Sequence, residues 1–220
     1  MIFITGGTGY IGKRLIPELI KRNFEVHALV RERSASTLPA GCKAVIGDAL
    51  DRTTFSGKII PCKTFIQLVG VPHPSPGKNK LFKKIDLVSV RESVQAAKDA
   101  GVEHFIYISV AQGGRVMKAF QEVRAYGEEL IRKSGMNATI IRPWYVIGPG
   151  HYWPLLFLPV YKVLELFPST NKMIQLYGLV YLNQLIAALI KAVEQPPSGI
   201  LIHAVQDIKK NILLMQFIKS

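Results

Sequence analysis

Short apolar runs alternate with longer amphipathic stretches over the first 143 residues of the chain. The short runs are mainly apolar and end at glycine, proline or charged residues, which is typical of buried strands. They lie at 2–5, 25–30, 43–46, 63–69, 104–109 and 138–141. Apolar residues recur at helical spacing in three of the intervening stretches, at 10–22, 82–100 and 117–134. The alternation predicts an α/β fold with a doubly wound, mostly parallel sheet and helices on both faces.

Glycine and proline mark the ends of these elements. Gly101 and Gly135 follow the second and third predicted helices, as glycine commonly does at a helix C-terminus. The segment 71–77 holds three prolines and predicts a loop. Pro17 conflicts with the first predicted helix, because an interior proline removes a hydrogen bond and kinks the helix.

The pattern changes beyond Gly150. Residues 151–168 are apolar and aromatic but hold three prolines, so they predict an irregular segment rather than another strand–helix unit. A helix at 181–194 and a last strand at 199–205 follow. We therefore expect one domain over residues 1–220, in which residues 151–220 form a small C-terminal lobe on the substrate side.

Composition narrows the class of protein. With 220 residues, 49% of them hydrophobic and 20% charged, the chain is not of the disordered class. The two cysteines, Cys42 and Cys62, have neither the number for a disulfide framework nor the paired spacing of a zinc site, so no metal site is predicted. The N-terminal residues lack the pattern of a signal peptide, and no run of 18 apolar residues occurs. A cytoplasmic protein without a transmembrane segment is expected.

The net charge of +13 favours anionic partners. A phosphorylated ligand, nucleic acid and an acidic surface all fit this charge. The densest basic run comprises Lys78, Lys80, Lys83 and Lys84, and its position predicts a solvated loop and helix start.

A glycine-rich run, TGGTGYIG at residues 5–12, follows the first predicted strand and opens the first predicted helix. Glycines at this place permit a tight turn and a close backbone approach to a pyrophosphate. The N-terminus of the helix supplies free N–H groups and positive potential. The sequence therefore predicts a dinucleotide site that includes Gly6, Thr8, Gly9, Tyr10, Ile11 and Gly12.

This run resembles the cofactor loop of the short-chain dehydrogenase/reductase superfamily, in its extended and atypical branch of epimerase/dehydratase-like proteins and related reductases. Other segments are similar to the same branch, at 47–51, 68–70, 105–109, 142–150 and 182–187. The resemblance implies a Rossmann-like fold, a nicotinamide cofactor and an oxidoreductase or epimerase-like activity on a small molecule. It places further cofactor contacts at Asp48, Ala49, Val69, Gly70 and Pro143.

The residue after the second predicted strand bears on the choice of cofactor. NAD sites usually hold the ribose 2′-OH with an acidic residue there, whereas an arginine accommodates the 2′-phosphate of NADP. Arg31 stands at this place and favours NADP(H). The adjacent Glu32 is the alternative occupant, and in that case NADH and NADPH bind similarly.

The catalytic pair of the family differs in this chain. The family places a tyrosine and a lysine four residues apart on one face of the helix after the fifth strand, and the matching positions are Phe120 and Arg124. Phenylalanine has no proton to donate, whereas Arg124 could still hold a ribose hydroxyl. A second register, from Tyr126 to Leu130, keeps the tyrosine but has no lysine. Ser109 matches the region of the family's serine, and a hydrogen bond at the strand end is its alternative role.

Three other residues are candidates for the missing proton donor. His73 lies in the proline-rich loop, and Tyr145 and His151 lie in or after the segment RPWYVIGPG at residues 142–150. Histidine transfers protons near neutral pH, although each of these residues could instead be an ordinary loop residue. The aromatic residues near them, Trp144 and Trp153 among them, predict either an apolar substrate pocket or simple packing.

These features support three hypotheses. The first is an atypical oxidoreductase or epimerase-like enzyme that prefers NADP, with NAD as the alternative. The second is a non-catalytic dinucleotide-binding redox sensor or regulator, which the absent tyrosine–lysine pair favours. The third is a peripheral membrane or quinone-associated protein, suggested by the apolar segment 151–168.

Overall fold

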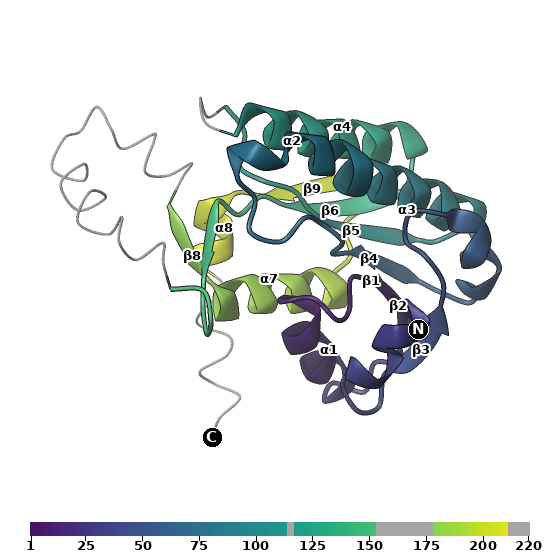
Figure 1. The fold of residues 1–220 in the computed structure, drawn as a ribbon. Helices are drawn as coiled ribbons and strands as arrows, with labels where there is room; N and C mark the ends of the chain where they lie inside the picture. The colour runs from purple at the N-terminus through teal and green to yellow at the C-terminus, as the bar shows by residue number, and fades with distance from the viewer. Residues whose placement is uncertain (114–116, 153–177, 211–220) are drawn as a thin grey trace, which may run out of the picture.

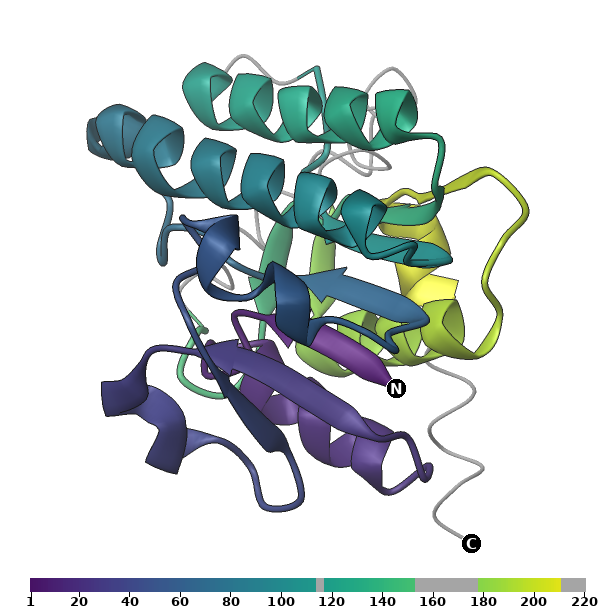
Figure 2. The same ribbon diagram turned by 90° about the vertical axis from the view of Figure 1, so that its right-hand side faces the viewer.

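A parallel β-sheet between two layers of helices forms the fold of the computed structural model, which describes residues 1–113, 117–152 and 178–210 (Figures 1 and 2). Within these residues the main sheet has seven strands in the order β3-β2-β1-β4-β5-β6-β9. The strands are β1 (Ile2–Thr5), β2 (Val26–Val30), β3 (Lys43–Ile46), β4 (Thr64–Gln67), β5 (His104–Ile108), β6 (Asn137–Ile141) and β9 (Ile200–His203). Every neighbouring pair in this sheet is parallel.

The helices cover both faces of the sheet. Figure 1 shows α1 and α7 on one face and α3 and α4 on the other. The bounds are α1 (Gly12–Ile20), α3 (Val88–Asp99), α4 (Lys118–Ser134) and α7 (Leu182–Glu194). Shorter helices are α2 (Asn79–Leu81), a π-helical stretch (Phe82–Leu87) and α8 (Val205–Lys210), and 3-10 turns lie at Glu32–Thr37, Arg52–Thr54, Ser56–Lys58 and Pro76–Lys78.

Two apolar cores follow from the alternation of side chains along the strands. Ile2 and Ile4 of β1 pack in the core beneath α1 and α7, whereas Phe3 between them packs in the core beneath α3 and α4. In the second core the rings of Phe65 and Phe105, from neighbouring strands, stack with centroids 5.2 Å apart. Because both faces are covered, the central strands β1, β4 and β5 are buried along their whole length.

The strand order reverses direction between β1 and β4. The chain proceeds from β1 outward to β3 on one side, then returns to β4 and continues outward to β9. Ligands of open α/β sheets bind in the crevice at such a switch point, outside the carboxyl ends of the strands. The glycine-rich run at residues 5–12 begins at this point.

Much of this architecture agrees with the sequence prediction. The doubly wound parallel sheet and its six predicted strands are confirmed, with ends that shift by one or two residues. Pro17 lies inside α1 without ending it. The helix predicted over 82–100 is confirmed over 82–99, and its first part is a π-helical stretch in which Asp86 is buried.

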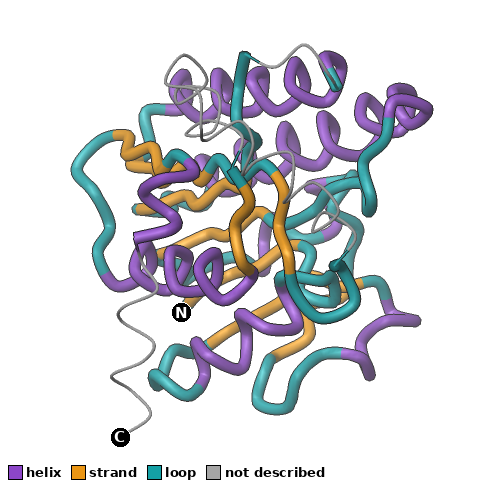
Figure 3. Tube along the Cα trace, turned by 90° about the vertical axis from the view of Figure 1, so that its left-hand side faces the viewer, coloured by secondary structure: helices purple, strands orange, loops and turns teal. Residues whose placement is uncertain are grey.

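Two short strands escaped the prediction. β7 (Tyr145–Ile147) and β8 (Leu179–Tyr181) pair in parallel as a separate two-stranded sheet, side by side in Figure 3. Each has three residues, which is too short for a strand pattern to show in the sequence.

Elements from the C-terminal part of the chain join the main sheet and its helical layer. The predicted helix at 181–194 is α7, which packs beside α1, and the predicted last strand is β9, which pairs with β6. Most of the predicted apolar segment, residues 153–177, lies outside the described residues. The substrate-side lobe therefore stays a prediction. No helix in the described ranges combines the length and hydropathy that a membrane span requires.

Candidate dinucleotide site

The phosphate loop connects β1 to α1 over residues 6–11. Gly6 has φ +78°, the left-handed region that favours glycine, and a Cβ atom there would lie 2.8 Å from the carbonyl carbon of Leu68. A Cβ atom on Gly12 would lie 2.5 Å from the carbonyl oxygen of Gly7. Glycine is therefore required at both positions, because the start of α1 packs directly against the loop and the loop against the end of β4.

The start of α1 offers unpaired hydrogen-bond donors. Within the described part of the chain, no acceptor meets the backbone N–H groups of Tyr10, Ile11 and Gly12, and no side chain caps the helix. Such N–H groups and the positive end of a helix dipole bind phosphate groups. The residues present thus fit the pyrophosphate of a dinucleotide.

The ends of β2 and β3 lie next to this loop in the strand order. Arg31 follows β2 directly and is exposed, as are Glu32 and Arg33 after it. Asp48 follows β3 and is exposed, and its carboxylate accepts the N–H of Leu50 at 3.0 Å. This carboxylate therefore also shapes its own turn, beside the half-buried Ala49 that the resemblance implies as a cofactor contact.

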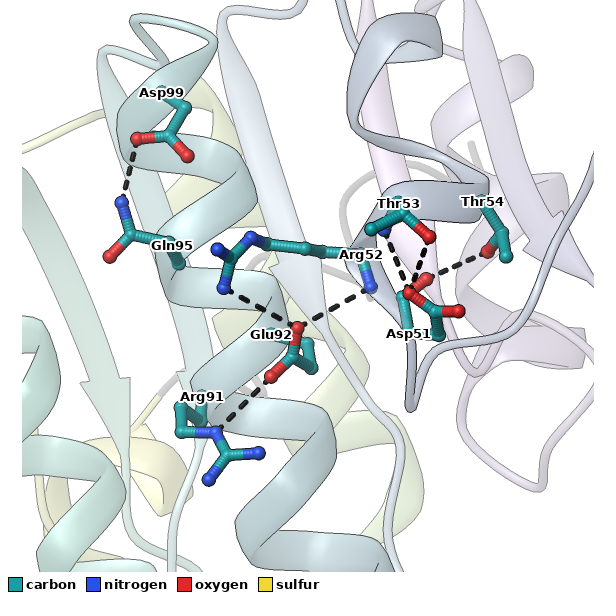
Figure 4. A network of polar contacts seen from close by, with 8 residues as sticks. All are labelled: Asp51, Arg52, Thr53, Thr54, Arg91, Glu92, Gln95 and Asp99. Atoms are coloured by element: carbon teal, nitrogen blue, oxygen red, sulfur yellow. Dashed lines mark hydrogen bonds and ion pairs between the residues drawn. The ribbon is translucent and has the colours of Figure 1, made fainter.

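A polar network attaches the segment after β3 to α3 (Figure 4). The Asp51 carboxylate accepts the N–H and the hydroxyl of Thr53 at 3.0 and 2.6 Å, which caps the turn. Glu92 of α3 lies 3.6 Å from the guanidinium of Arg52 and 3.1 Å from that of Arg91. The largely buried Glu92 thereby fixes the segment that follows the predicted cofactor contacts Asp48 and Ala49.

An ion pair lies beneath the loop after β4. The Asp86 carboxylate, fully buried, accepts from Nη2 of Arg124 at 2.6 Å and from the N–H of Val71 at 3.0 Å. The Arg124 guanidinium also donates to the carbonyl of Ile108 at 2.9 Å. A Cβ atom on Gly70 would lie 2.3 Å from Nη2 of Arg124, so glycine at residue 70 gives the guanidinium its room.

The Arg124 side chain is therefore buried. Its side chain is 9% exposed, and its guanidinium carbon lies 5.1 Å from the ring centroid of Phe120. Two buried polar atoms nearby, Nε of Arg124 and the hydroxyl of Tyr107, have no hydrogen-bond partner within the described residues. The contact of Arg124 with a ribose stays a prediction. The contacts of Arg124 with Asp86 and Ile108 give this side chain a structural role.

Ser109 belongs to a second buried network. Its hydroxyl donates to Glu128 at 2.6 Å, and Nε of Arg142 donates to the same carboxylate at 2.8 Å. Burial alone would raise the pKa of Glu128, but the hydrogen bonds from Arg142 and Ser109 outweigh it, so the pKa lies below its ordinary value. The network holds the start of the segment with Pro143 against β5 and α4. These contacts match the alternative role of Ser109, a hydrogen bond at the strand end.

The other three candidate donors lie on loops or on β7. The rings of His73 and His151 have centroids 5.3 Å apart, and His151 lies 6.0 Å from the ring of Tyr10. Tyr145 packs its half-buried ring edge-on against Trp144, with centroids 5.6 Å apart. Burial raises the pKa of Tyr145, so this phenol keeps its proton at neutral pH.

Asp86 is the functional-site neighbour that sequence reasoning missed. An available signal was its place in the predicted helix, four residues after Phe82 and four before Val90, which puts it on an apolar face. A carboxylate on the buried face of a helix calls for a cationic partner, because an unpaired buried charge is strongly unfavourable.

Taken together, the parallel sheet, the switch point and the unpaired N–H groups of the glycine-rich loop define an α/β protein that binds a nicotinamide dinucleotide. The chain belongs to the NAD(P)H-binding family, whose family model matches residues 6–148.

Curated relatives carry the names of reductases and epimerases. A 4-hydroxy-2-methyl-3-oxo-4-farnesyl-3,4-dihydroquinoline-1-oxide ketoreductase of Stigmatella aurantiaca is 24% identical over 168 residues, 66% of this chain and 50% of that protein. The sugar epimerase YhfK of Bacillus subtilis, itself uncharacterized, is 29% identical over 155 residues, 64% of this chain and 70% of that protein. The chain thus spans about half the length of the ketoreductase.

Solved structures share the fold. The structure of MoeE5 in complex with UDP-glucose and NAD superposes with a TM-score of 0.69 at 18% identity. The superposition covers 98% of this chain and 82% of that chain.

Proposed function

We propose that the protein is an NADP(H)-preferring oxidoreductase or epimerase-like enzyme that acts on a small apolar or mixed molecule. A bound nicotinamide would carry the hydride of such a reaction, while residues of the chain hold and orient the cofactor and the substrate. The unpaired N–H groups at the start of α1 support the cofactor part of this proposal.

The position of Arg31 carries the preference for NADP(H). Arg31 is exposed at the carboxyl end of β2, next to the strand that leads into the phosphate loop. A guanidinium forms charge-assisted hydrogen bonds with a phosphate that are worth about 1.5–3 kcal/mol, or roughly 10- to 150-fold in affinity. Glu32 beside it is the alternative occupant of this position, and in that case NADH and NADPH would bind similarly.

An apolar substrate is supported by two observations. One relative is named as a ketoreductase of a farnesylated quinoline oxide, which is a largely apolar molecule. In this chain, Trp144 and Tyr145 lie half-buried in the segment that follows β6, where aromatic side chains offer apolar surface to a ligand.

A second candidate function, a redox sensor or regulator without catalysis, is favoured by the contacts of α4. Phe120 stands where the family's tyrosine is expected, and its ring packs against Phe82 with centroids 5.0 Å apart. Arg124, at the place of the lysine, is held by Asp86 rather than open to a ligand. A protein of this kind would bind the dinucleotide and transfer no hydride.

The cofactor part is tested by binding measurements with NADPH and NADH. We expect NADPH to bind at least tenfold more tightly at low salt, and high salt to narrow the gap. Arg31→Ala should abolish most of the difference. Arg33→Ala, two residues further along the same exposed turn, is the matched control and should preserve it. Equal affinities in the unmodified protein would contradict the preference.

Turnover assays distinguish the enzyme hypothesis from the regulator hypothesis. Apolar ketones and quinones are screened with NADPH at the nicotinamide absorbance, with the unmodified protein and with Phe120→Tyr. A general acid contributes about 10²- to 10⁴-fold in rate, so the unmodified protein should be slow and Phe120→Tyr faster. Phe24→Tyr adds a hydroxyl to another half-buried phenylalanine and should change nothing. Fast turnover by the unmodified protein would show that a phenol at residue 120 is not needed, whereas bound cofactor without turnover in either protein would favour the regulator.

A further inference from the structure

Two histidines from separate loops meet beside the phosphate loop. His73 belongs to the loop after β4, and His151 follows β7. Their ring centroids lie 5.3 Å apart, and the ring of Tyr10, the residue that leads into α1, lies 6.0 Å from His151. His151 therefore adjoins the side chain of Tyr10, whose backbone N–H is one of the groups that fit a pyrophosphate, and His73 lies beside His151.

The His73 loop is fixed by several contacts. His73 has φ +49°, a conformation uncommon for a residue other than glycine, and prolines stand on both sides of it. Nζ of Lys78 donates to the carbonyl oxygens of Pro72 and His73 at 2.7 and 2.9 Å. These contacts hold a strained backbone in place and determine where the imidazole lies.

The His151 turn is fixed against α1. The N–H of His151 donates to the carbonyl of Gly148 at 2.8 Å. A Cβ atom on Gly148 would lie 2.5 Å from the hydroxyl of Tyr10, so this turn and the phosphate loop are in close contact. Nη1 and Nη2 of Arg14 donate to the carbonyl oxygens of Tyr10 and Pro149 at 2.9 and 3.3 Å, which ties the same two segments together.

Within the described residues, the side chains in contact with the pair or its two loops include Tyr10, Arg14 and Lys78, which are neutral or cationic. The Arg14 guanidinium lies 4.4 Å from the centroid of the Tyr10 ring, Lys78 is bound to the His73 loop, and Tyr152 follows His151. Partial burial and the neighbouring His73 lower the pKa of His151. His151 is therefore biased toward its uncharged form, and protonation of both imidazoles would place two like charges side by side, with ring centroids 5.3 Å apart.

We infer that His73 and His151 form an electrostatic contact for the pyrophosphate of the dinucleotide, so that their protonation tightens its binding. This inference rests on the proposed function only in that a dinucleotide must occupy the phosphate loop. An anion between the imidazoles and the helix N-terminus would relieve the repulsion between two imidazolium groups. One added charge about 6 Å from an anion, in a medium between water and protein interior, changes affinity by roughly tenfold.

The experiment measures the dissociation constants of NAD⁺ and ADP-ribose by calorimetry between pH 5.5 and 8.0. Both carry the pyrophosphate, and neither has the 2′-phosphate, whose own titration would obscure the result. Adenosine, which lacks phosphate, is the ligand control. We expect both phosphate-containing ligands to bind about five- to tenfold more tightly at pH 5.5 and adenosine to bind equally at both pH values.

Variants assign the effect to the two residues. His73→Asn suits the left-handed backbone, because asparagine tolerates positive φ, and His151→Gln keeps a polar side chain. The double variant should reduce the pH effect to less than twofold, and either single variant should reduce it in part. His27→Gln is the matched control, because His27 lies on β2 beside Glu25 and should leave the pH effect unchanged. Thermal unfolding at both pH values confirms that each variant is folded.

Binding of the ligand should in turn change the pKa values of the two histidines. ADP-ribose should raise the pKa of both imidazoles in an NMR titration, since a ligand and a proton that favour each other's binding do so reciprocally. A pH effect that persists in the double variant, or no pH effect in the unmodified protein, would overturn the inference while leaving the proposed cofactor in place. Failure of NAD⁺, NADH and NADPH to bind at any pH would overturn both.

Discussion

Removal of the Asp86 carboxylate should destabilise the fold severely. Asp86→Ala leaves the Arg124 guanidinium, 9% exposed, without its 2.6 Å partner and leaves the N–H of Val71 without an acceptor. Breaking a buried ion pair by removal of one partner costs about 3–5 kcal/mol. Domains of this kind are stable by roughly 5–15 kcal/mol in total, so the loss would be a large share of the free energy of unfolding.

Urea denaturation followed by circular dichroism measures this loss. Asp99→Ala is the control, since Asp99 is exposed at the end of α3 and accepts a hydrogen bond from Gln95 there, so the change should cost less than about 0.5 kcal/mol. Replacing both partners, as Asp86→Leu with Arg124→Met, should recover most of the stability lost in Asp86→Ala, because an apolar pair of similar volume needs no charge compensation.

A loss below about 1 kcal/mol in Asp86→Ala would refute the assignment of Arg124 to a structural ion pair. The guanidinium would then have to be solvated or held by another anion in the folded protein. Such a result would return Arg124 to the role of a ribose contact.

Other expected outcomes concern pH, packing and the segment after β3. Burial lowers the pKa of His104 to about 4, so in this pH range the unfolded chain binds a proton that the folded chain excludes. The free energy of unfolding should therefore fall by about 3 kcal/mol as the pH drops from 6.5 to 4. Thermal melts measure this fall, and the melts of His104→Gln should depend less on pH. Gly70→Ala should cost about 1–3 kcal/mol through its clash with Arg124, whereas Gly57→Ala, with nothing within 4 Å of its Cβ, should be nearly neutral in urea titrations. Glu92→Gln should speed amide hydrogen exchange in the segment after β3 and leave exchange in β5 unchanged.

The elements that the sequence predicts well are those with strictly local causes. A strand covered on both faces is rich in apolar residues, so β1, β4 and β5 each show at least two consecutive apolar residues in the sequence. The phosphate loop is visible because its glycines stand directly between such a strand and an amphipathic helix.

The parts that escaped prediction depend on residues far apart in the chain. Asp86 and Arg124 lie 38 residues apart, and no periodicity in either segment indicates that they meet. The approach of His73 to His151 depends on the positions of two loops, which the spacing of apolar residues does not determine. The positions of loops depend on the tertiary structure, so local sequence propensities do not predict which loops lie close together.

The packing of α1 against α7 has a consequence for how the chain is made. Leu15, Ile16 and Leu19 of α1 share one core with residues of α7, which the ribosome adds more than 160 residues later. Until α7 has emerged, the apolar face of α1 lacks part of its cover, and β6 lacks the neighbour that β9 provides. Such contacts between distant segments slow folding and prolong the exposure of apolar surface. Apolar surface of the nascent protein should therefore stay exposed, as a target for chaperones, until α7 and β9 have been synthesised.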